Sequence, residues 1–513
     1  MVAINQNDLR IKNAQNLIQS LSEGDSYAFM GRPSPWESDI AAPTVARQEA
    51  GDMSPPYPDN NWKEYYRTWN QMLSMKAIRP EEAKYMIPKL NWTSGVVYDI
   101  YRHDYNKFTR SYSNAQNLYD ALFVVVNQNR FVYVCLDNNN NSQSLVEPLA
   151  TSDEPFYTTD GYQWLRMYRI SDTDYRKFST NNYMPITDEL INKKTEGAVY
   201  TIKIDSPGDD YTTRPPGKAD EIPFYFCRIV GDGQDGVAMV YIFNGRIDKI
   251  RISDPGYGYT YAKLKFEANH VFDNLSDLYQ NKNALNPQGN GGLRTTAIIS
   301  PPGGWGYERT VVGIDQQNFK DDTTTLARQL GGTRVGVFSD MKGNEADFIE
   351  DTTFRQVGIL QDTKGYIVDD APRRTISVYN TVKVNRTTDG DSTQYIIGEM
   401  ISQDSSYGQV VGVQQEGDDI YINYIQDPFL HCDPVTGNLD RFTGDEIITG
   451  DTSGVTSRPD ITFSDFHSNQ QFLDGYSLGE VMRYRGNFTY IDNSTATVRN
   501  KTQTERLSMI IEY

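Results

Sequence analysis

Near Leu122 the spacing of apolar residues changes from a helical period to a period of two. Upstream, residues 8–21 place apolar side chains on one helical face, and Gly24 ends that pattern. Downstream, alternating segments are joined by short polar turns, as in the hairpin pattern at 123–136. The change predicts a mainly β fold with α+β character at the N-terminus and helices confined largely to residues 8–92.

An aromatic stripe with helical spacing follows a Pro-rich loop at 37–61, and it comprises Trp62, Tyr65, Tyr66, Trp69, Met72 and Leu73. Such a stripe can face the core or form an exposed assembly surface, and the spacing leaves both interpretations open. A short strand is expected at Tyr27 to Met30. Another short helix is expected to begin at Pro80 and to end at Pro88.

Two internal duplications lie in the β region. Residues 197–213 and 245–261 align at an offset of 48, and each copy is an alternating strand followed by Pro-Gly, a turn signal. Residues 395–406 and 442–453 align at an offset of 47. Two copies are too few for a solenoid, so the duplications predict small β units. In the second unit the copies can pair and bury Ile397, Met400 or Ile401 against Ile447 or Ile448.

Composition and charge exclude several classes of protein. A net charge of −19 opposes sequence-independent binding of nucleic acid, which needs a positive surface. The longest apolar run, Val237 to Phe243, is far shorter than the ~20 residues of a membrane span. The polar start at Asn5 to Asp8 is not typical of a secretory signal. The 35 tyrosines suit half-buried strands and wet protein interfaces.

The cysteines and histidines give no pattern typical of a disulfide framework or a metal site. Three cysteines without a CxxC spacing favour folding in a reducing cytoplasm. No two of the four histidines lie three or four positions apart, and His431, Cys432 and Asp433 are adjacent, which makes a poor chelate on a strand. The histidines, His103, His270, His431 and His467, are therefore interpreted as surface residues.

Three motifs approach known sites without completing them. The Gly-rich sequence 231–236 has the GxGxxG spacing, but strands are expected on both sides, so a hairpin is predicted instead of a dinucleotide site. The loop beginning at Asp137 has Ser142 and Pro148 where a calcium loop needs Gly and Glu, and 433–437 fails the same template. The sequence 450–454 lacks the spacing of a nucleophile elbow. We therefore predict no catalytic, cofactor-binding or metal-binding residues.

Seven short blocks follow one another along the chain, at 29–36, 54–59, 69–92, 133–137, 160–164, 354–359 and 479–511. The first is FMGRPSPW, the second is SPPYPD, and the fourth and fifth are YVCLD and DGYQW. In the same order, the blocks resemble the baseplate wedge protein family of T-even-like contractile-tailed phages that is conventionally called gene product eight. The family's motifs "FGR-x-x-PW", "PPYP", "YRCLD" and "DGYVW" are similar to these four.

The resemblance covers about 1–185, 334–362 and 466–513, and it implies an antiparallel β-sandwich-like scaffold with two inserted β modules. The expected domains are an N-terminal wedge scaffold with helices and β-sheet, an inserted β domain with the Gly-Tyr-Thr repeat, a return to the scaffold, an inserted duplicated β module, and C-terminal strands that complete the scaffold. Their expected bounds are 1–190, 191–330, 331–364, 365–465 and 466–513.

The resemblance further implies a structural protein of the virion, located in the tail baseplate and assembled in the host cytoplasm. Its expected partners are a second copy, in a homodimer, and other wedge proteins, with no enzymatic activity, no cofactor, no nucleic acid and no membrane. Two alternatives stay open. A receptor- or glycan-binding tail protein would stack sugars on exposed aromatic rings. A cell-wall glycosidase would need two carboxylates about 5–10 Å apart in a cleft.

Overall fold

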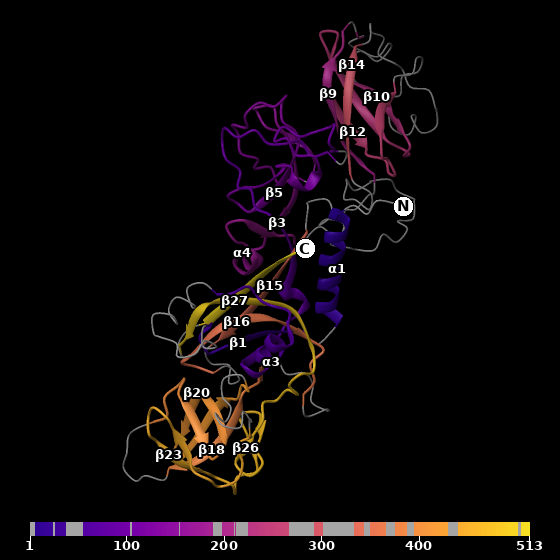
Figure 1. The fold of residues 1–513 in the computed structure, drawn as a ribbon. Helices are drawn as coiled ribbons and strands as arrows, with labels where there is room; N and C mark the ends of the chain where they lie inside the picture. The colour runs from indigo at the N-terminus through magenta and orange to yellow at the C-terminus, as the bar shows by residue number, and fades with distance from the viewer. Residues whose placement is uncertain are drawn as a thin grey trace. The chain divides into compact units, whose positions relative to one another are not determined.

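The computed structural model is mainly β (Figure 1). The chain divides into two compact units. The first unit comprises Met1–Leu17, Lys84–Gly336 and Ile510–Tyr513, and the second comprises Ile18–Ala83 and Val337–Met509. The structure describes residues 6–23, 26–36, 55–102, 105–152, 154–187, 197–209, 211, 224–265, 292–300, 333–342, 349–365, 375–386, 394–428, 440–500 and 504–513.

The described residues contain three α-helices: α1 (Gln6–Glu23), α3 (Trp62–Asn70) and α4 (Asp172–Phe178). In α1 the predicted apolar face is buried at Ile11, Ala14, Leu17 and Leu21. Helix α4 lies outside the expected helical region 8–92. Its N-terminal signal is a capping serine, because the Ser171 hydroxyl accepts a hydrogen bond from the Asp174 N–H at 3.0 Å.

The predicted helix at Pro80 is wrong in extent. Only Pro80–Glu82 form a 3₁₀ turn, and the chain then enters strand β3 (Ala83–Pro88). The Glu82 carboxylate accepts a hydrogen bond from the Arg79 N–H at 3.0 Å and caps this single turn. Strand burial then decides the conformation, since Tyr85, Met86 and Ile87 are buried. The predicted strand at Tyr27 to Met30 is confirmed as β1 (Ser26–Gly31).

The first unit contains three separate antiparallel sheets in addition to the β3–β8 pair. One sheet has the order β4-β5-β7-β6, a second has the order β12-β11-β10-β13, and a third pairs β14 with β9. The strands are β4 (Val124–Val126), β5 (Phe131–Asp137), β6 (Phe156–Tyr157), β7 (Gln163–Arg169), β8 (Tyr183–Pro185), β9 (Val199–Pro207), β10 (Phe224–Gly231), β11 (Val237–Phe243), β12 (Arg246–Asp254), β13 (Ala262–Lys265) and β14 (Leu293–Ile299). The predicted hairpin at 123–136 is confirmed as β4–β5.

The first duplication folds so that its two copies bond to each other reciprocally. The Tyr259 N–H of the second copy donates to the Gly197 carbonyl of the first at 3.1 Å. The Tyr211 N–H of the first copy donates to the Gly245 carbonyl of the second at 2.9 Å. Because Gly197 matches Gly245 and Tyr211 matches Tyr259 at the offset of 48, these bonds relate the copies by a local twofold pseudo-symmetry. Both tyrosines are buried in the same apolar cluster.

The second unit contains a five-stranded antiparallel sheet with the order β17-β2-β1-β16-β27. Figure 1 shows β1, β16 and β27 side by side although they come from distant parts of the sequence. Its core includes Phe29, Trp69 and Val378. The strands after β1 are β2 (Met72–Ala77), β16 (Thr352–Gln361), β17 (Thr375–Ser377) and β27 (Asn487–Arg499). Two further strands, β15 (Arg334–Lys342) and β28 (Thr504–Glu512), contain residues of both units.

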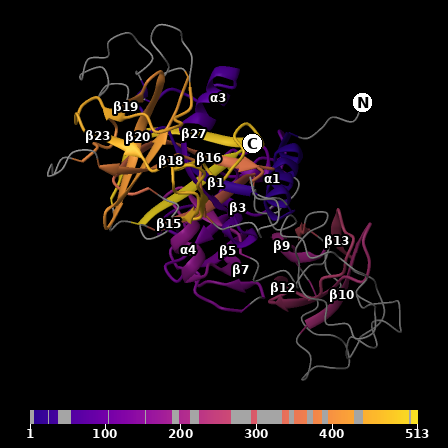
Figure 2. The same ribbon diagram turned by 90° about the horizontal axis from the view of Figure 1, so that it is seen from below.

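A closed antiparallel barrel forms the rest of the second unit. The order β21-β20-β19-β22-β23-β18 closes because β18 also pairs with β21, and β18, β19, β20 and β23 are grouped together in Figure 2. Closure removes the free edges that a flat sheet would leave. The strands are β18 (Asn380–Arg386), β19 (Met400–Gln403), β20 (Ser406–Glu416), β21 (Asp419–Ile425), β22 (Ile448–Gly450) and β23 (Thr456–Pro459). Three strands of two residues follow them: β24 (Phe466–His467), β25 (Gln470–Gln471) and β26 (Tyr476–Ser477).

The second duplication supplies one side of this barrel, and its copies pair as predicted. Ser402 of β19 is the ladder partner of Thr449 of β22, and these two residues match at the offset of 47. The ladder is therefore centred on a local twofold axis, with β20 and β23 flanking it on either side. Of the residues predicted to meet there, Ile401 and Ile448 are buried in the barrel core, whereas Ile447 is 40% exposed.

Candidate functional site

The aromatic stripe of α3 is divided between the core and the surface. The helix begins after Asn61, whose side-chain oxygen accepts a hydrogen bond from the Glu64 N–H at 2.9 Å. Trp69 is buried in the core beside the five-stranded sheet of the second unit, which is called the scaffold sheet below. Trp62, in contrast, is 76% exposed and Tyr66 is 39% exposed. The predicted continuation of the helix beyond residue 70 is wrong, because Met72 already belongs to strand β2.

The exposed part of the stripe continues onto a residue from the C-terminal region. The rings of Trp62 and Tyr66 have centroids 6.3 Å apart, and the ring of Tyr66 lies 5.0 Å from that of Tyr484, which is 43% exposed. These three residues, Trp62, Tyr66 and Tyr484, are called the α3 aromatic row below. Exposed apolar groups gathered in this way mark interaction surfaces more often than isolated ones do.

The backbone of Tyr484 is held in an uncommon conformation that places its ring in the row. Its φ is +65°, in the left-handed region that is unfavourable for residues other than glycine. The Tyr484 hydroxyl donates a hydrogen bond to the Asn70 side-chain oxygen at 2.7 Å, at the end of α3. Conformations of this kind cost about 1–3 kcal/mol. Together, the exposure of the three rings and their contacts make the row the candidate site.

A Pro-rich segment enters α3 directly beside the row. Residues 56–61 are all exposed, and the Tyr57 side chain is 96% exposed. The Asn61 side-chain amide donates to the Asp59 carboxylate at 2.6 Å, which fixes the end of the segment at the helix cap. Prolines at 55, 56 and 58 favour the extended polyproline II conformation. The sequence alone did not indicate that Tyr57 and Tyr484 belong to this surface, since neither follows the helical period.

Buried charges hold α3 against the rest of the second unit. The Arg67 guanidinium lies 3.7 Å from the Asp427 carboxylate, and their side chains are 1% and 0% exposed. The Gln71 amide donates to the same carboxylate at 2.5 Å. Arg67 also lies 3.5 Å from Glu64, which in turn lies 3.6 Å from Arg32. Trp62 and Tyr66 therefore lie on a helix whose position is fixed by a largely buried ion-pair network.

The Gly-rich sequence 231–236 is a hairpin between β10 and β11, as predicted from the strands around it. Its glycines make room for the buried ring of Tyr259, because a Cβ at Gly233 would lie 2.4 Å from that ring. The Tyr259 hydroxyl donates to the Ile229 carbonyl at 2.9 Å and accepts from the Gly236 N–H at 3.1 Å. The GxGxxG spacing thus serves the packing of the duplicated unit.

Asp232 in the same hairpin binds the loop that follows the second repeat. Its carboxylate accepts hydrogen bonds from the Thr260 hydroxyl, from the Thr260 N–H at 2.8 Å and from the Tyr261 N–H at 3.1 Å. These donors, the Thr260 hydroxyl first, lower the pKa of Asp232 to about 2.

This pKa predicts an acid-dependent contribution to stability. Because the pKa in the folded state is below the ordinary value of about 3.9, the stabilisation is present above that value and is lost as the pH falls through about 2. We expect Asp232→Asn to lower the melting temperature at pH 7 by about 1–3 °C, and the difference from wild type to disappear near pH 2. Thermal unfolding followed by circular dichroism measures it, with the exposed Asp248→Asn as control. A constant difference at all pH values would contradict the assignment.

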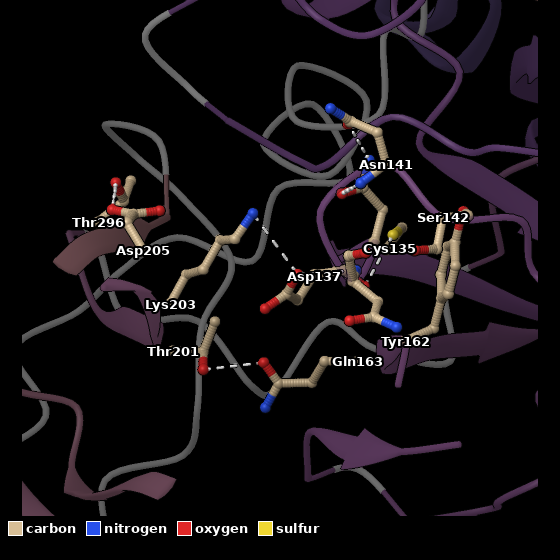
Figure 3. Close-up of polar contacts among 12 residues, drawn as sticks. Cys135, Asp137, Asn141, Ser142, Tyr162, Gln163, Thr201, Lys203, Asp205 and Thr296 are labelled. Atoms are coloured by element: carbon tan, nitrogen blue, oxygen red, sulfur yellow. Dashed lines mark hydrogen bonds and ion pairs between the residues drawn. The ribbon is translucent and has the colours of Figure 1, made fainter. Parts of the chain in front are cut away.

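The Asn-rich sequence 137–142 forms a tight polar turn at the end of β5, shown in Figure 3. Asn139, Asn140 and Asn141 have φ values of 48°, 55° and 63°. The Asn138 side-chain amide donates to the Asn141 side-chain oxygen at 2.9 Å, and the Asn141 N–H donates to the Asn138 side-chain oxygen at 3.0 Å. The side-chain oxygens of Asn138 and Asn141 are therefore used within the turn.

The first residue of this turn joins two strands of the first unit. Figure 3 shows the Lys203 ammonium of β9 directed at Asp137, with an N–O distance of 3.6 Å. Beside it, the Thr201 hydroxyl donates to the Gln163 side chain at 2.9 Å. Burial raises the pKa of Asp137, and the charge of Lys203 opposes that shift. The arrangement is a mostly buried ion pair that stabilises the packing of β9 beside β5.

The histidines and the other motifs considered in the sequence form no metal-binding cluster in the described part of the chain. Among the described residues, no group of three or more His, Cys, Asp or Glu side chains is arranged to hold a metal ion. His467 stacks on the Tyr421 ring at a centroid distance of 3.8 Å. His103, His270, His431, Cys432 and 433–437 lie outside the described residues. The turn at 450–454 donates the Thr452 and Ser453 N–H groups to the Glu399 carboxylate, which fixes the barrel hairpin.

Comparison with known proteins adds no family assignment: no protein-family model and no curated protein matches the sequence. Within the described part of the chain, the helices are all too short or too polar to cross a membrane.

Proposed function

We propose that the chain is a structural component of a contractile-tail baseplate wedge, which forms a homodimer and links neighbouring baseplate proteins. The observation that carries the proposal is the pairing of the blocks that resemble the wedge protein family. Strand β1, from the first block, pairs with β16, from the sixth, with Phe29 opposite Gly358. Strand β16 in turn pairs with β27, from the seventh, with Phe354 opposite Thr497.

Two more blocks pair in the first unit. Strands β5 and β7 carry the blocks 133–137 and 160–164, and Cys135 lies opposite Trp164 in their ladder. Short blocks that resembled one family by chance would have no reason to be ladder partners. Their pairing therefore supports a common scaffold whose strands are separated in the sequence by the two proposed insertions.

The α3 aromatic row supports an assembly role because aromatic side chains are enriched at the centres of protein interfaces. In the proposed function this surface contacts a neighbouring subunit. The strongly negative chain would then bind other proteins of the tail instead of nucleic acid.

The proposal is tested with the purified chain and the other wedge proteins of a contractile-tailed phage. We expect light scattering to give twice the mass of one chain, and co-sedimentation to recover the chain in a complex with at least one wedge protein. Antibody labelling of intact virions should mark the baseplate. A chain that is monomeric at all concentrations, joins no wedge protein and is absent from the tail would contradict the proposal.

A second candidate is a receptor- or glycan-binding tail protein. The observation in its favour is the exposure of Trp62 and Tyr57 close to the polar side chains of Asp59 and Asn61. Aromatic rings stack on sugar rings, and carboxylate and amide groups bind their hydroxyls. A glycan array distinguishes the two candidates, since saturable binding that is lost in Trp62→Ala would favour glycan recognition.

A further inference from the structure

We propose that the Pro-rich segment at residues 55–59 of one copy binds the α3 aromatic row of a second copy, and that the second copy returns the same contact. This inference rests on the proposed function, because it assigns the surface that forms the homodimer.

The row offers neighbouring aromatic rings along which a polyproline II segment can lie. Such a segment has three residues per turn and rises about 3.1 Å per residue, so Pro55 and Pro58 lie on the same face, about 9 Å apart along its axis. The ring centroids are 6.3 Å apart between Trp62 and Tyr66 and 5.0 Å apart between Tyr66 and Tyr484, so the three rings form a continuous surface for that face. Grooves that recognise Pro-rich segments are lined by aromatic side chains of this kind.

The segment has the properties of the ligand. Proline fixes φ before binding, so little conformational entropy is lost on docking. The Tyr57 ring is 96% exposed, which leaves a large amphipathic side chain without cover in the isolated chain. The segment ends at the cap of the same helix, held by the bond between Asn61 and Asp59.

Charge complementarity favours a second copy as the occupant. Asp59 follows the Pro-rich segment and is exposed, and Arg485 follows the last ring of the row and is also exposed. A reciprocal exchange would therefore place a carboxylate near a guanidinium at each of the two contacts. Because the same patch contains both the segment and the row, the interface is self-complementary and closes as a twofold dimer.

The test uses two variants of the full chain, each of which removes one half of the contact. Tyr57→Ala removes the segment's anchor, and Trp62→Ala removes part of the row. We expect each variant alone to weaken the dimer at least tenfold in sedimentation equilibrium, with an unchanged circular dichroism spectrum. Phe108→Ala is the control, because Phe108 is 85% exposed outside the patch and should leave the dimer unchanged.

Mixing the two variants provides the decisive measurement. A heterodimer of Trp62→Ala with Tyr57→Ala retains one complete contact, formed by the intact segment of the former and the intact row of the latter. We therefore expect the mixture to dimerise more strongly than either variant alone. A merely structural effect of the substitutions would not produce this recovery.

The outcomes separate this inference from the proposed function. If wild type and both variants dimerise equally, or if mixing gives no recovery, the reciprocal contact is wrong while the wedge proposal stands. If the row binds a Pro-rich segment of another wedge protein and wild type stays monomeric, the second copy is the wrong occupant. If wild type neither dimerises nor joins any wedge protein, both proposals are wrong.

Discussion

Asp427→Ala is expected to lower the free energy of unfolding of the second unit by about 3–5 kcal/mol, the usual effect of breaking a buried ion pair. Asp427 is fully buried, and its carboxylate faces the buried Arg67 guanidinium at 3.7 Å. Its removal leaves a positive charge in the core without that carboxylate, while Glu64 stays at 3.5 Å from Arg67. The Gln71 amide also loses the acceptor to which it donates.

The expected loss of unfolding free energy in Asp427→Ala comes from the Arg67 charge that remains in the core. A double variant tests this explanation. Arg67→Met with Asp427→Leu removes both charges, so we expect it to recover most of the lost stability. Denaturant unfolding followed by tryptophan fluorescence is a suitable measurement, because Trp69 lies on the same helix in the core. Glu81→Ala is the control. Its ion pair with Arg79 is exposed and should contribute less than about 1 kcal/mol. Equal losses in the single and double variants would contradict this account.

The local parts of the fold follow from the sequence because their signals are local. The mainly β class, the β4–β5 hairpin and the Gly-rich hairpin at 231–236 were predicted from alternation and turn residues. Pairing of the second duplication was also predicted, because two copies of one strand and turn can present the same edge to each other.

The boundary of α3 could not be predicted in this way. A helical stripe and a following strand can share apolar residues, and Met72 fits both periods. The chain leaves the helix after Asn70 because β2 pairs with β1, a partner more than 40 residues upstream. At Pro80 the same tertiary preference for a strand limits the helix to one turn.

The candidate site was predictable only in part. The spacing of Trp62, Tyr65, Tyr66 and Trp69 indicated a helical stripe, but not which of its rings would be exposed. That division depends on the sheet beneath α3 and on Asp427, which is separated by 356 residues from Gln71, the helix-end residue that it binds. Tyr484 joins the row through a backbone conformation that no periodic pattern indicates.

Removal of the barrel from the chain is expected to leave a folded scaffold sheet only if the deletion keeps every strand of that sheet, including the edge strand β17. The expected module at 365–465 includes β17, which pairs with β2, and Val378, which is buried beside Trp69 and Phe29. A cut at 380–478 keeps both. Its ends lie close together, because Thr381 pairs with Ser477 and a Cβ at Gly479 would lie 2.4 Å from the Val378 carbonyl.

The excision also removes Asp427, so the charge on Arg67 must be removed with it. We expect a chain that lacks 380–478, with a short Gly/Ser linker and Arg67→Met, to be soluble and to unfold cooperatively. The linker itself costs little, since loop closure changes by only about 0.6 kcal/mol per doubling of length. The same excision with Arg67 retained should melt at a lower temperature, because the guanidinium has lost the Asp427 carboxylate.

Excision of 365–465 should abolish cooperative unfolding of the scaffold, since it removes the edge strand that covers β2 and part of the core around Trp69. Thermal circular dichroism and size-exclusion chromatography of the three variants measure these differences. If the chains that lack 380–478 and 365–465 both fold and melt at the same temperature, β17 contributes nothing to the stability of the scaffold sheet. If neither folds even with Arg67→Met, the barrel and the scaffold sheet share a single core and the barrel is not an inserted module.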